Sequence, residues 1–248
     1  MGLVDLVKSD ISYKKYFDST SYLRGYEGKC FIEGDKILKF YFFSKEKKDF
    51  IDLSVYHSPY ISFPINYFEV FDKIVGEEMP YFRKNCIKNS IGEETNYNLL
   101  KKNYLNIMKE LVKFKEIYMQ DLCYVNVLYD ETGFNIIDTT QWDLRINKNR
   151  SFESNESLFN ESLLKIISSV IDLNEYDIEW SFKNAMLKRG QVGIDLLNLI
   201  KNGRRDTAYL NEMFELYAFL CNKEYGKEIK TLEDAKKYAK MLKNDWFY

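Results

Sequence analysis

Three polar residues near the middle of the chain have types and an order that suit chemistry on a hydroxyl group and a metal ion. Asp121 and Asn126 lie five positions apart at the end of a long amphipathic segment, and Asp138 follows the apolar run at residues 134–137. A carboxylate can accept a proton from a hydroxyl group. Carboxylate and amide oxygens are ligands that Mg²⁺ prefers. These three residues are therefore the first candidates for a functional site.

The same segment resembles the catalytic loop and the metal-binding strand of protein kinases and their small-molecule relatives. Asp121 and Asn126 match the pattern H-R-D-x-x-x-x-N, and Asp138 matches the Asp of D-F-G. The resemblance extends over about residues 20–170 and makes the chain similar to the protein-kinase-like superfamily, as a divergent bacterial-type Ser/Thr kinase-like protein. It implies that Asp121 is the catalytic base and that Asn126 and Asp138 hold Mg²⁺ with bound ATP.

A second part of this resemblance lies upstream. Residues 36–40, KILKF, resemble the V-A-I-K strand, whose lysine contacts the α- and β-phosphates of ATP. Lys39 is the residue that this match selects, as a catalytic and nucleotide-binding side chain, and Lys36 at the preceding turn is the competing candidate. Gly25 and Gly28 take the place of the glycine-rich loop that covers the phosphates.

The resemblance also supplies an adenine-binding segment. Residues 75–82, VGEEMPYF, are similar to the fifth strand and hinge of a kinase. Met79 would then close the back of the adenine pocket. Proline has no N–H, so the hydrogen bond to the adenine edge would come from Tyr81 or Phe82 and not from Pro80.

The chain departs from the kinase pattern at several positions. Met119 and Gln120 replace the His and Arg of H-R-D, and Thr139 and Thr140 replace the Phe and Gly of D-F-G. Cys123 stands where typical Ser/Thr kinases have a lysine. Without the arginine, a phosphorylated activation loop has no usual partner.

The carboxylate that pairs with the lysine in kinases has no obvious counterpart. Asp49 fits best by its position, and Glu46 and Asp52 are alternatives. All three lie in the segment 44–56, which has apolar residues at helical spacing and is expected to form a helix.

The elements that must position these residues divide into two parts. Residues 1–82 are expected to form an N-lobe with a five-stranded sheet and one helix, and residues 83–248 a helical C-lobe with the catalytic loop. The strands are expected at residues 21–25, 29–33, 36–43, 65–70 and 73–82. The expected fold is α+β, with a small antiparallel β lobe and a larger helical lobe.

The second part reads as one long helix, a hairpin and further helices. Residues 96–118 form an amphipathic pattern, and a hairpin turn is expected at residues 130–133. Helices are then expected from Leu158 onward and at residues 175–187, 193–201, 208–221 and 232–242. Thr231 is the expected N-cap of the last helix.

The composition excludes several other classes of protein. The 248 residues carry a net charge of −2, which gives no overall attraction to nucleic acid or to a membrane surface. No apolar run is long enough to span a membrane. The four cysteines are scattered and there is one histidine, so a zinc site is not expected and the pattern suits a reduced, cytoplasmic protein.

The sequence thus favours an ATP-dependent phosphotransferase that moves the γ-phosphate of Mg-ATP to a hydroxyl acceptor. The acceptor is either a protein Ser/Thr, which the family resemblance favours, or a small molecule, which the short segment after Asp138 without an A-P-E motif favours. The alternative is a nucleotide-binding pseudokinase that acts as a regulatory or scaffolding module.

Overall fold

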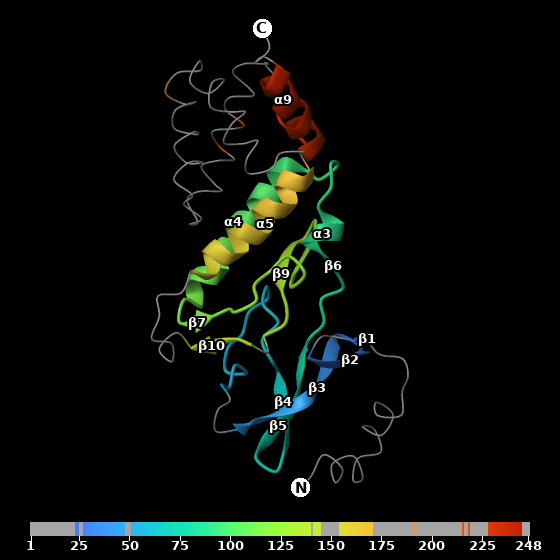
Figure 1. Ribbon diagram of the computed structural model, residues 1–248, viewed down its shortest axis with the longest axis vertical. Helices are drawn as coiled ribbons and strands as arrows, with labels where there is room; N and C mark the ends of the chain where they lie inside the picture. Colours follow the sequence, from blue (N-terminus) through green and yellow to red (C-terminus); the bar gives the residue numbers. More distant parts are fainter. Residues whose placement is uncertain are drawn as a thin grey trace. The chain divides into compact units, whose positions relative to one another are not determined.

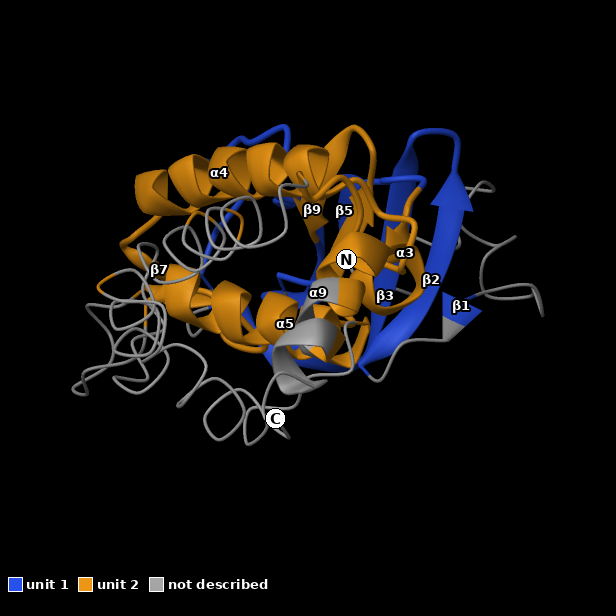
Figure 2. Cartoon of the chain, turned by 90° about the horizontal axis from the view of Figure 1, so that it is seen from above, with its two compact units in different colours: residues 1–83, 137–140 blue, residues 84–136, 141–248 orange. Residues whose placement is uncertain are grey.

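The computed structural model describes residues 23–24, 27–47, 51–139, 141–144, 154–170, 191, 215, 218 and 228–244. The chain forms two compact units (Figure 2). Unit 1 comprises residues 1–83 and 137–140, and unit 2 comprises residues 84–136 and 141–248. The division into 1–82 and 83–248 stays a prediction, and residues 137–140 are grouped with unit 1.

Unit 1 is built on one antiparallel sheet of five strands, in the order β1-β2-β3-β5-β4 (Figure 1). The strands are β1 (Leu23–Arg24), β2 (Gly28–Glu33), β3 (Lys36–Glu46), β4 (Asn66–Val70) and β5 (Lys73–Pro80). They coincide with the five strands expected from the sequence to within a few residues. A tight turn at Gly34 and Asp35 joins β2 to β3, and Gly34 has a φ of 66°.

Aromatic side chains hold one face of this sheet together. Phe31, Leu38 and Phe40 form a buried cluster with Phe68 packed against it. The rings of Phe40 and Phe68 stack with their centroids 5.2 Å apart. Because side chains alternate along a strand, Lys39 points to the opposite face from Leu38 and Phe40.

The helix expected at residues 44–56 is wrong for the part that the structure describes. Strand β3 continues to Glu46, where it pairs with Lys73 of β5. Residues 51–56 contain no helix. The side chain of Asp52 accepts hydrogen bonds from the backbone N–H and the hydroxyl of Ser54, at 2.9 and 2.5 Å, and such local bonds compete with helix formation.

Strands β4 and β5 are joined by a two-residue turn at Phe71 and Asp72. Both residues have positive φ, 46° and 58°. Positive φ at both central residues is the geometry of a type I′ turn, which suits the twist of a hairpin but favours Gly and Asn over Phe. Phe71 is 67% exposed, so packing of its side chain does not compensate.

Unit 2 combines helices with two small sheets. Strands β6 (Asn85–Cys86), β8 (Val127–Asp130) and β9 (Gly133–Ile136) form one sheet, and β7 (Ile117–Tyr118) pairs with β10 (Asp143–Leu144) in the other. Its helices are α3 (Ile87–Ser90), α4 (Tyr97–Lys113), α5 (Asn155–Val170) and α9 (Leu232–Asn244). The hairpin expected around residues 130–133 is the β8–β9 hairpin. The mixed content makes the fold α+β.

Helix α4 is the long amphipathic helix of the sequence. Its N-cap Asn96 accepts a hydrogen bond from the N–H of Leu99 at 2.9 Å, and Leu100, Ile107 and Leu111 are fully buried along one side. The helix ends at Lys113, earlier than the expected residue 118. The residues after it turn and form β7, since Ile117 and Tyr118 pair with β10.

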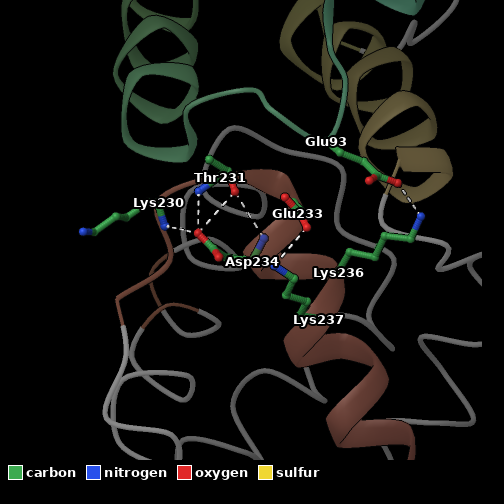
Figure 3. A network of polar contacts seen from close by, with 7 residues as sticks. All are labelled: Glu93, Lys230, Thr231, Glu233, Asp234, Lys236 and Lys237. Carbon is green, nitrogen blue, oxygen red and sulfur yellow. Dashed lines mark hydrogen bonds and ion pairs between the residues drawn. The ribbon is translucent and has the colours of Figure 1, made fainter.

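Helix α9 begins at the cap expected from the sequence. The hydroxyl of Thr231 accepts from the N–H of Asp234 at 3.2 Å, and a carboxylate oxygen of Asp234 accepts from the N–H of Thr231 at 3.1 Å (Figure 3). Burial acts to raise the pKa of Asp234, but the hydrogen bonds from Thr231 and Lys230 outweigh it and hold this pKa below its ordinary value. Lys236 pairs with Glu93 at 2.5 Å, which ties the helix to the segment before α4.

The helices expected at residues 175–187, 193–201 and 208–221 lie almost entirely outside the described residues. Within the described part of the chain, no helix has the length and apolar character needed to cross a membrane.

Candidate functional site

Lys39 lies at the centre of a charged cluster in unit 1. Its side chain is 4% exposed, and its Nζ is 2.6 Å from Oδ1 of Asp138 and 3.3 Å from Oε2 of Glu27. Lys39 and Asp138 are separated by 99 positions in sequence. Two residues that the sequence selected independently are therefore brought into direct contact.

The charge of Lys39 is maintained by its neighbours. Burial on its own would lower the pKa of this lysine, because a low-dielectric environment disfavours the charged form. The carboxylates of Asp138, Glu77 and Glu27 outweigh burial, and the pKa of Lys39 is raised above its ordinary value. Lys39 is thus a cation at neutral pH.

Burial also shifts the pKa values of two other side chains near this cluster, Lys45 and Cys30. Burial lowers the pKa of Lys45, against the attraction of Glu27 and Glu77. Burial also raises the pKa of the Cys30 thiol to about 11, against the opposing effect of Lys39. Cys30 is therefore protonated and weakly nucleophilic at neutral pH.

Asp138 has an unusual backbone conformation. It follows directly after Ile137 at the end of the β8–β9 hairpin, its φ is 64°, and its side chain is 38% exposed. A non-glycine residue with positive φ costs conformational energy and is found most often at functional sites, although Asp tolerates this region better than most. Thr139, the next residue, is 2% exposed.

The glycine pair is described only at its second member, because Gly25 lies outside the described residues. Gly28 belongs to β2 and lies opposite Tyr41 of β3. A Cβ at this position would lie 2.2 Å from the carbonyl oxygen of Phe40, so close packing of the two strands requires glycine here. Glu27 precedes Gly28, and its carbonyl oxygen accepts from the N–H of Phe42 at 2.8 Å.

The expected adenine-binding residues occupy the end of β5 and the segment after it. Met79 is 4% exposed and lies opposite Ile37 of β3, on the same face as Lys39. The N–H of Tyr81 donates to the carbonyl oxygen of Asp35 at 2.8 Å. This removes Tyr81 as the adenine donor, and of the two expected donors only Phe82 remains.

None of the carboxylates expected from the sequence to pair with Lys39 does so among the described residues. Glu46 pairs with Lys73 at 3.2 Å, and Asp52 binds Ser54. Asp49 lies outside the described residues. The observed partners are Asp138 and Glu27.

Asp121 and Asn126 lie together in a tight loop of unit 2. Asp121 is exposed and has a φ of 65°. The side-chain amide N–H of Asn126 donates to the carbonyl oxygen of Asp121 at 3.0 Å, and the N–H of Cys123 donates to the same oxygen at 2.8 Å. These bonds close the loop through the backbone of Asp121 and do not involve its carboxylate.

Helix α5 anchors this loop through two buried side chains. Asn155 donates to the carbonyl oxygens of Phe114 and Ile117, at 3.3 and 2.9 Å, and accepts from the N–H of Met119 at 3.1 Å. Ser162 donates to the carbonyl oxygen of Leu122 at 3.1 Å. The residues on both sides of Asp121 are thereby held in place.

Three of these residues were not selected by the sequence, namely Glu27, Glu77 and Asn155. Glu77 had a readable signal, because it alternates with Val75 and Met79 along a strand and so falls on a face expected to be buried. Glu27 and Asn155 had no such sequence signal, since each is identified only by its contacts with another segment of the chain.

The expected metal ligands, Asp138 and Asn126, belong to different units. The described residues contain no cluster of three or more His, Cys, Asp or Glu side chains able to hold a metal ion by themselves. Mg²⁺ in phosphate-transferring sites is typically bound by one or two protein oxygens together with phosphates and water. Asp138 and Asn126 each carry an oxygen of the kind that Mg²⁺ binds.

Comparison with known proteins adds no assignment. No model of a protein family matches the chain. No curated protein matches it with a significant score.

Proposed function

We propose that the chain is an ATP-dependent phosphotransferase of the protein-kinase-like fold, which transfers the γ-phosphate of Mg-ATP to a hydroxyl group of a protein or a small molecule. The observation that carries the proposal is the contact of 2.6 Å between buried Lys39 and Asp138. These are the two residues that the kinase resemblance assigns to the phosphates and to the metal ion. Their meeting across 99 positions supports both assignments at once.

In this proposal Lys39 binds the α- and β-phosphates. Its raised pKa keeps the ammonium group charged at neutral pH, as binding of an anion requires. The strand β3 holds the side chain in a defined direction, and strand sites position groups more accurately than loops do.

Asp138 and Asn126 are the residues that would hold Mg²⁺. The ion would neutralise part of the negative charge of the phosphates when it is bound. Asn126 uses its N–H to contact Asp121, so its amide oxygen is not needed for that bond. Lys39 balances the negative charge of Asp138 when no metal ion is bound.

Asp121 is the proposed base. Its exposed carboxylate would orient the acceptor hydroxyl and take its proton as the bond to phosphorus forms. The strained φ of 65° is consistent with a residue held for function, because a relaxed loop would avoid this cost.

The alternative is a pseudokinase that binds nucleotide without transferring phosphate. It is favoured by the residues before Asp121, since Met119 is fully buried and Gln120 cannot supply the charge of the missing arginine. A pseudokinase would use nucleotide occupancy to regulate a partner.

Transfer of labelled γ-phosphate from Mg-ATP separates the two functions. Wild type is incubated with a panel of proteins and a panel of alcohols and sugars, and autophosphorylation and release to water are also measured. We expect Asp121→Asn to lower the transfer rate by about 10²–10⁴-fold, the usual contribution of a general base. The control is Glu131→Gln, which neutralises an exposed carboxylate in the β8–β9 turn and should leave the rate unchanged.

Each outcome has a definite meaning. Binding of ATP without transfer by wild type would support the pseudokinase and reject the phosphotransferase. A product whose mass contains the whole nucleotide would show transfer of a different group. Failure to bind ATP would reject both functions.

A further inference from the structure

The face of the sheet around Lys39 contains a second buried charge. Glu77 of β5 is the residue directly opposite Lys39 of β3 in the antiparallel ladder. Residues in such positions have their Cβ atoms about 4.5–5.5 Å apart, within reach of long side chains. Glu77 is 1% exposed and Lys39 is 4% exposed, so neither charge is stabilised by bulk water.

A carboxylate buried to this degree requires a cation close to it. The lysines whose titration Glu77 influences are Lys39 and Lys45. Lys45 is the more exposed of the two and lies 5.3 Å above the ring of Tyr41. Lys39 is a buried cation that lies directly across the ladder from Glu77.

The three carboxylates around Lys39 differ in how firmly they are fixed. The side chains of Asp138 and Glu27 are 38% and 23% exposed. Both lie outside the central strands, and in the proposed function both border the phosphates. Glu77 belongs to a strand that is paired on both sides, with Lys39 of β3 and Tyr67 of β4 as its neighbours. Of the three carboxylates, Glu77 is the one whose backbone is held by neighbouring strands on both sides.

We propose that Glu77 is the permanent counter-ion of Lys39 and a positioning residue of the nucleotide site, supplied by the sheet and not by an inserted helix. Its role in catalysis rests on the proposed function, whereas the pairing of the two charges does not. Asp138 and Glu27 are the exchangeable partners, which Lys39 gives up for phosphate oxygens. Glu77 keeps the ammonium group aligned throughout this exchange.

A double-mutant cycle tests the pairing without reference to activity. The free energy of unfolding is measured for wild type, Glu77→Gln, Lys39→Met and the double variant. We expect Glu77→Gln to lower the free energy of unfolding strongly when Lys39 is present, because a buried cation then has less negative charge near it. In a protein that already carries Lys39→Met, the same substitution should lower the free energy of unfolding much less. Additive effects would overturn the pairing.

Glu78→Gln is the matched control for this cycle. Glu78 is the next residue of β5, its side chain lies on the other face, and its carboxylate pairs with Lys36 at 2.5 Å. Its effect should add to that of Lys39→Met. If Glu77→Gln alone does not fold, the double variant decides. Recovery of folding in the double variant supports the pairing. A double variant that stays unfolded, while Lys39→Met on its own folds, rejects the pairing.

A chemical readout reports on Lys39 directly. The full-length protein is treated with acetic anhydride at pH 8, and acetylation of Lys39 is followed by mass spectrometry. Removal of a neighbouring negative charge lowers the pKa of a lysine and so increases its reactive, neutral fraction. We expect Glu77→Gln to increase the labelling rate on the order of tenfold and Glu78→Gln to leave it unchanged. An unchanged rate in Glu77→Gln would overturn the proposal.

Kinetic measurements then separate this inference from the proposed function. We expect Glu77→Gln to raise KM for ATP more than it lowers kcat, and Glu77→Asp to restore part of the loss. Coupled unfolding and altered labelling without any phosphate transfer would reject the phosphotransferase and keep the pairing. Asp121-dependent transfer with no coupling between Lys39 and Glu77 would keep the phosphotransferase and reject this role of Glu77.

Discussion

Gly28 shows how a glycine can be required for packing at a position where the sequence suggested phosphate binding. A Cβ at residue 28 would lie 2.2 Å from the carbonyl oxygen of Phe40, which is a backbone atom and cannot rotate away. We expect Gly28→Ala to lower the free energy of unfolding by about 1–3 kcal/mol, because β2 and β3 must separate to admit the methyl group. Urea unfolding followed by circular dichroism measures this.

Gly92→Ala is the matched control for this substitution. No atom lies within 4 Å of the position that its Cβ would take. Its effect should stay within about 0.5 kcal/mol. Equal effects of the two substitutions would mean that strand packing does not explain the glycine at position 28.

At the level of single residues, the sequence identified the residues with chemical motifs but not their partners. Lys39 and Asp138 match short patterns, and the structure brings them into contact. Glu27, the second observed partner of Lys39, carries no motif, and one of many carboxylates in a sequence cannot be selected without the strand register. The alternatives Glu46 and Asp52 were wrong, because Glu46 pairs with Lys73 across the β3–β5 ladder and Asp52 binds Ser54.

The β4–β5 turn is an element whose sequence does not suit its geometry. Phe71 has a φ of 46° and an exposed side chain, so it bears the cost of a left-handed conformation without a gain from packing. We expect Phe71→Asn to raise the free energy of unfolding by about 0.5–1 kcal/mol, because Asn adopts this conformation more readily. Thermal and urea unfolding provide the measurement.

Phe43→Asn controls for the loss of an exposed aromatic ring. Phe43 is 87% exposed and lies within β3, with no positive φ. This substitution should not stabilise the protein, since Asn is disfavoured in strands. A gain at Phe43 equal to that at Phe71 would attribute the effect to surface polarity and not to the turn.

Helix α5 supports the Asp121 loop through Asn155, which makes three buried hydrogen bonds to the backbone of residues 114–119. Asn155→Ala leaves two carbonyl oxygens and the N–H of Met119 without this partner. We expect a loss of about 2–4 kcal/mol in the free energy of unfolding and faster amide hydrogen exchange at residues 117–122. Ser157→Ala, two residues along the helix, should leave that exchange unchanged. An unchanged exchange rate at residues 117–122 in Asn155→Ala would show that the loop keeps its structure without this side chain.

Elements with a strong sequence period were predictable, and elements set by local competition were not. Alternation and turn residues located the strands of unit 1 and the β8–β9 hairpin. The apolar spacing in residues 44–56 suggested a helix, but pairing with β5 and the turn at Asp52 prevailed. The end of α4 was placed too late, because the pairing of β7 with β10 depends on residues 143–144 far along the chain.

The pH dependence of stability belongs to the molecule as a whole. Cys30, Lys39 and Tyr67 of unit 1 all have a pKa raised above the ordinary value, with burial as the first cause for Cys30 and Tyr67 and the surrounding carboxylates outweighing burial for Lys39. In each case the folded state holds its proton more tightly than the unfolded state. Stability from these groups is fully present at neutral pH and is lost as the pH rises.

We expect the free energy of unfolding to fall as the pH is raised from about 9 to about 11, the window over which the Cys30 thiol ionises. Cys30→Ala should make this fall less steep, because it removes one of the three groups. Cys86→Ala, in unit 2, serves as the control. A slope that Cys30→Ala does not change would show that the thiol has no part in the alkaline loss.

The four residues 137–140 have a consequence for how this protein can be divided or recombined. The chain leaves unit 1 after residue 83 and returns to it only for these residues before continuing in unit 2. A genetic cassette that carries residues 1–83 would transplant the complete sheet together with Lys39, Glu27 and Glu77. It would leave Asp138 behind, and with it the closest ion-pair partner of the lysine. No cut at residue 83 can therefore move the intact charged cluster, and duplication or shuffling must carry the chain at least through Asp138.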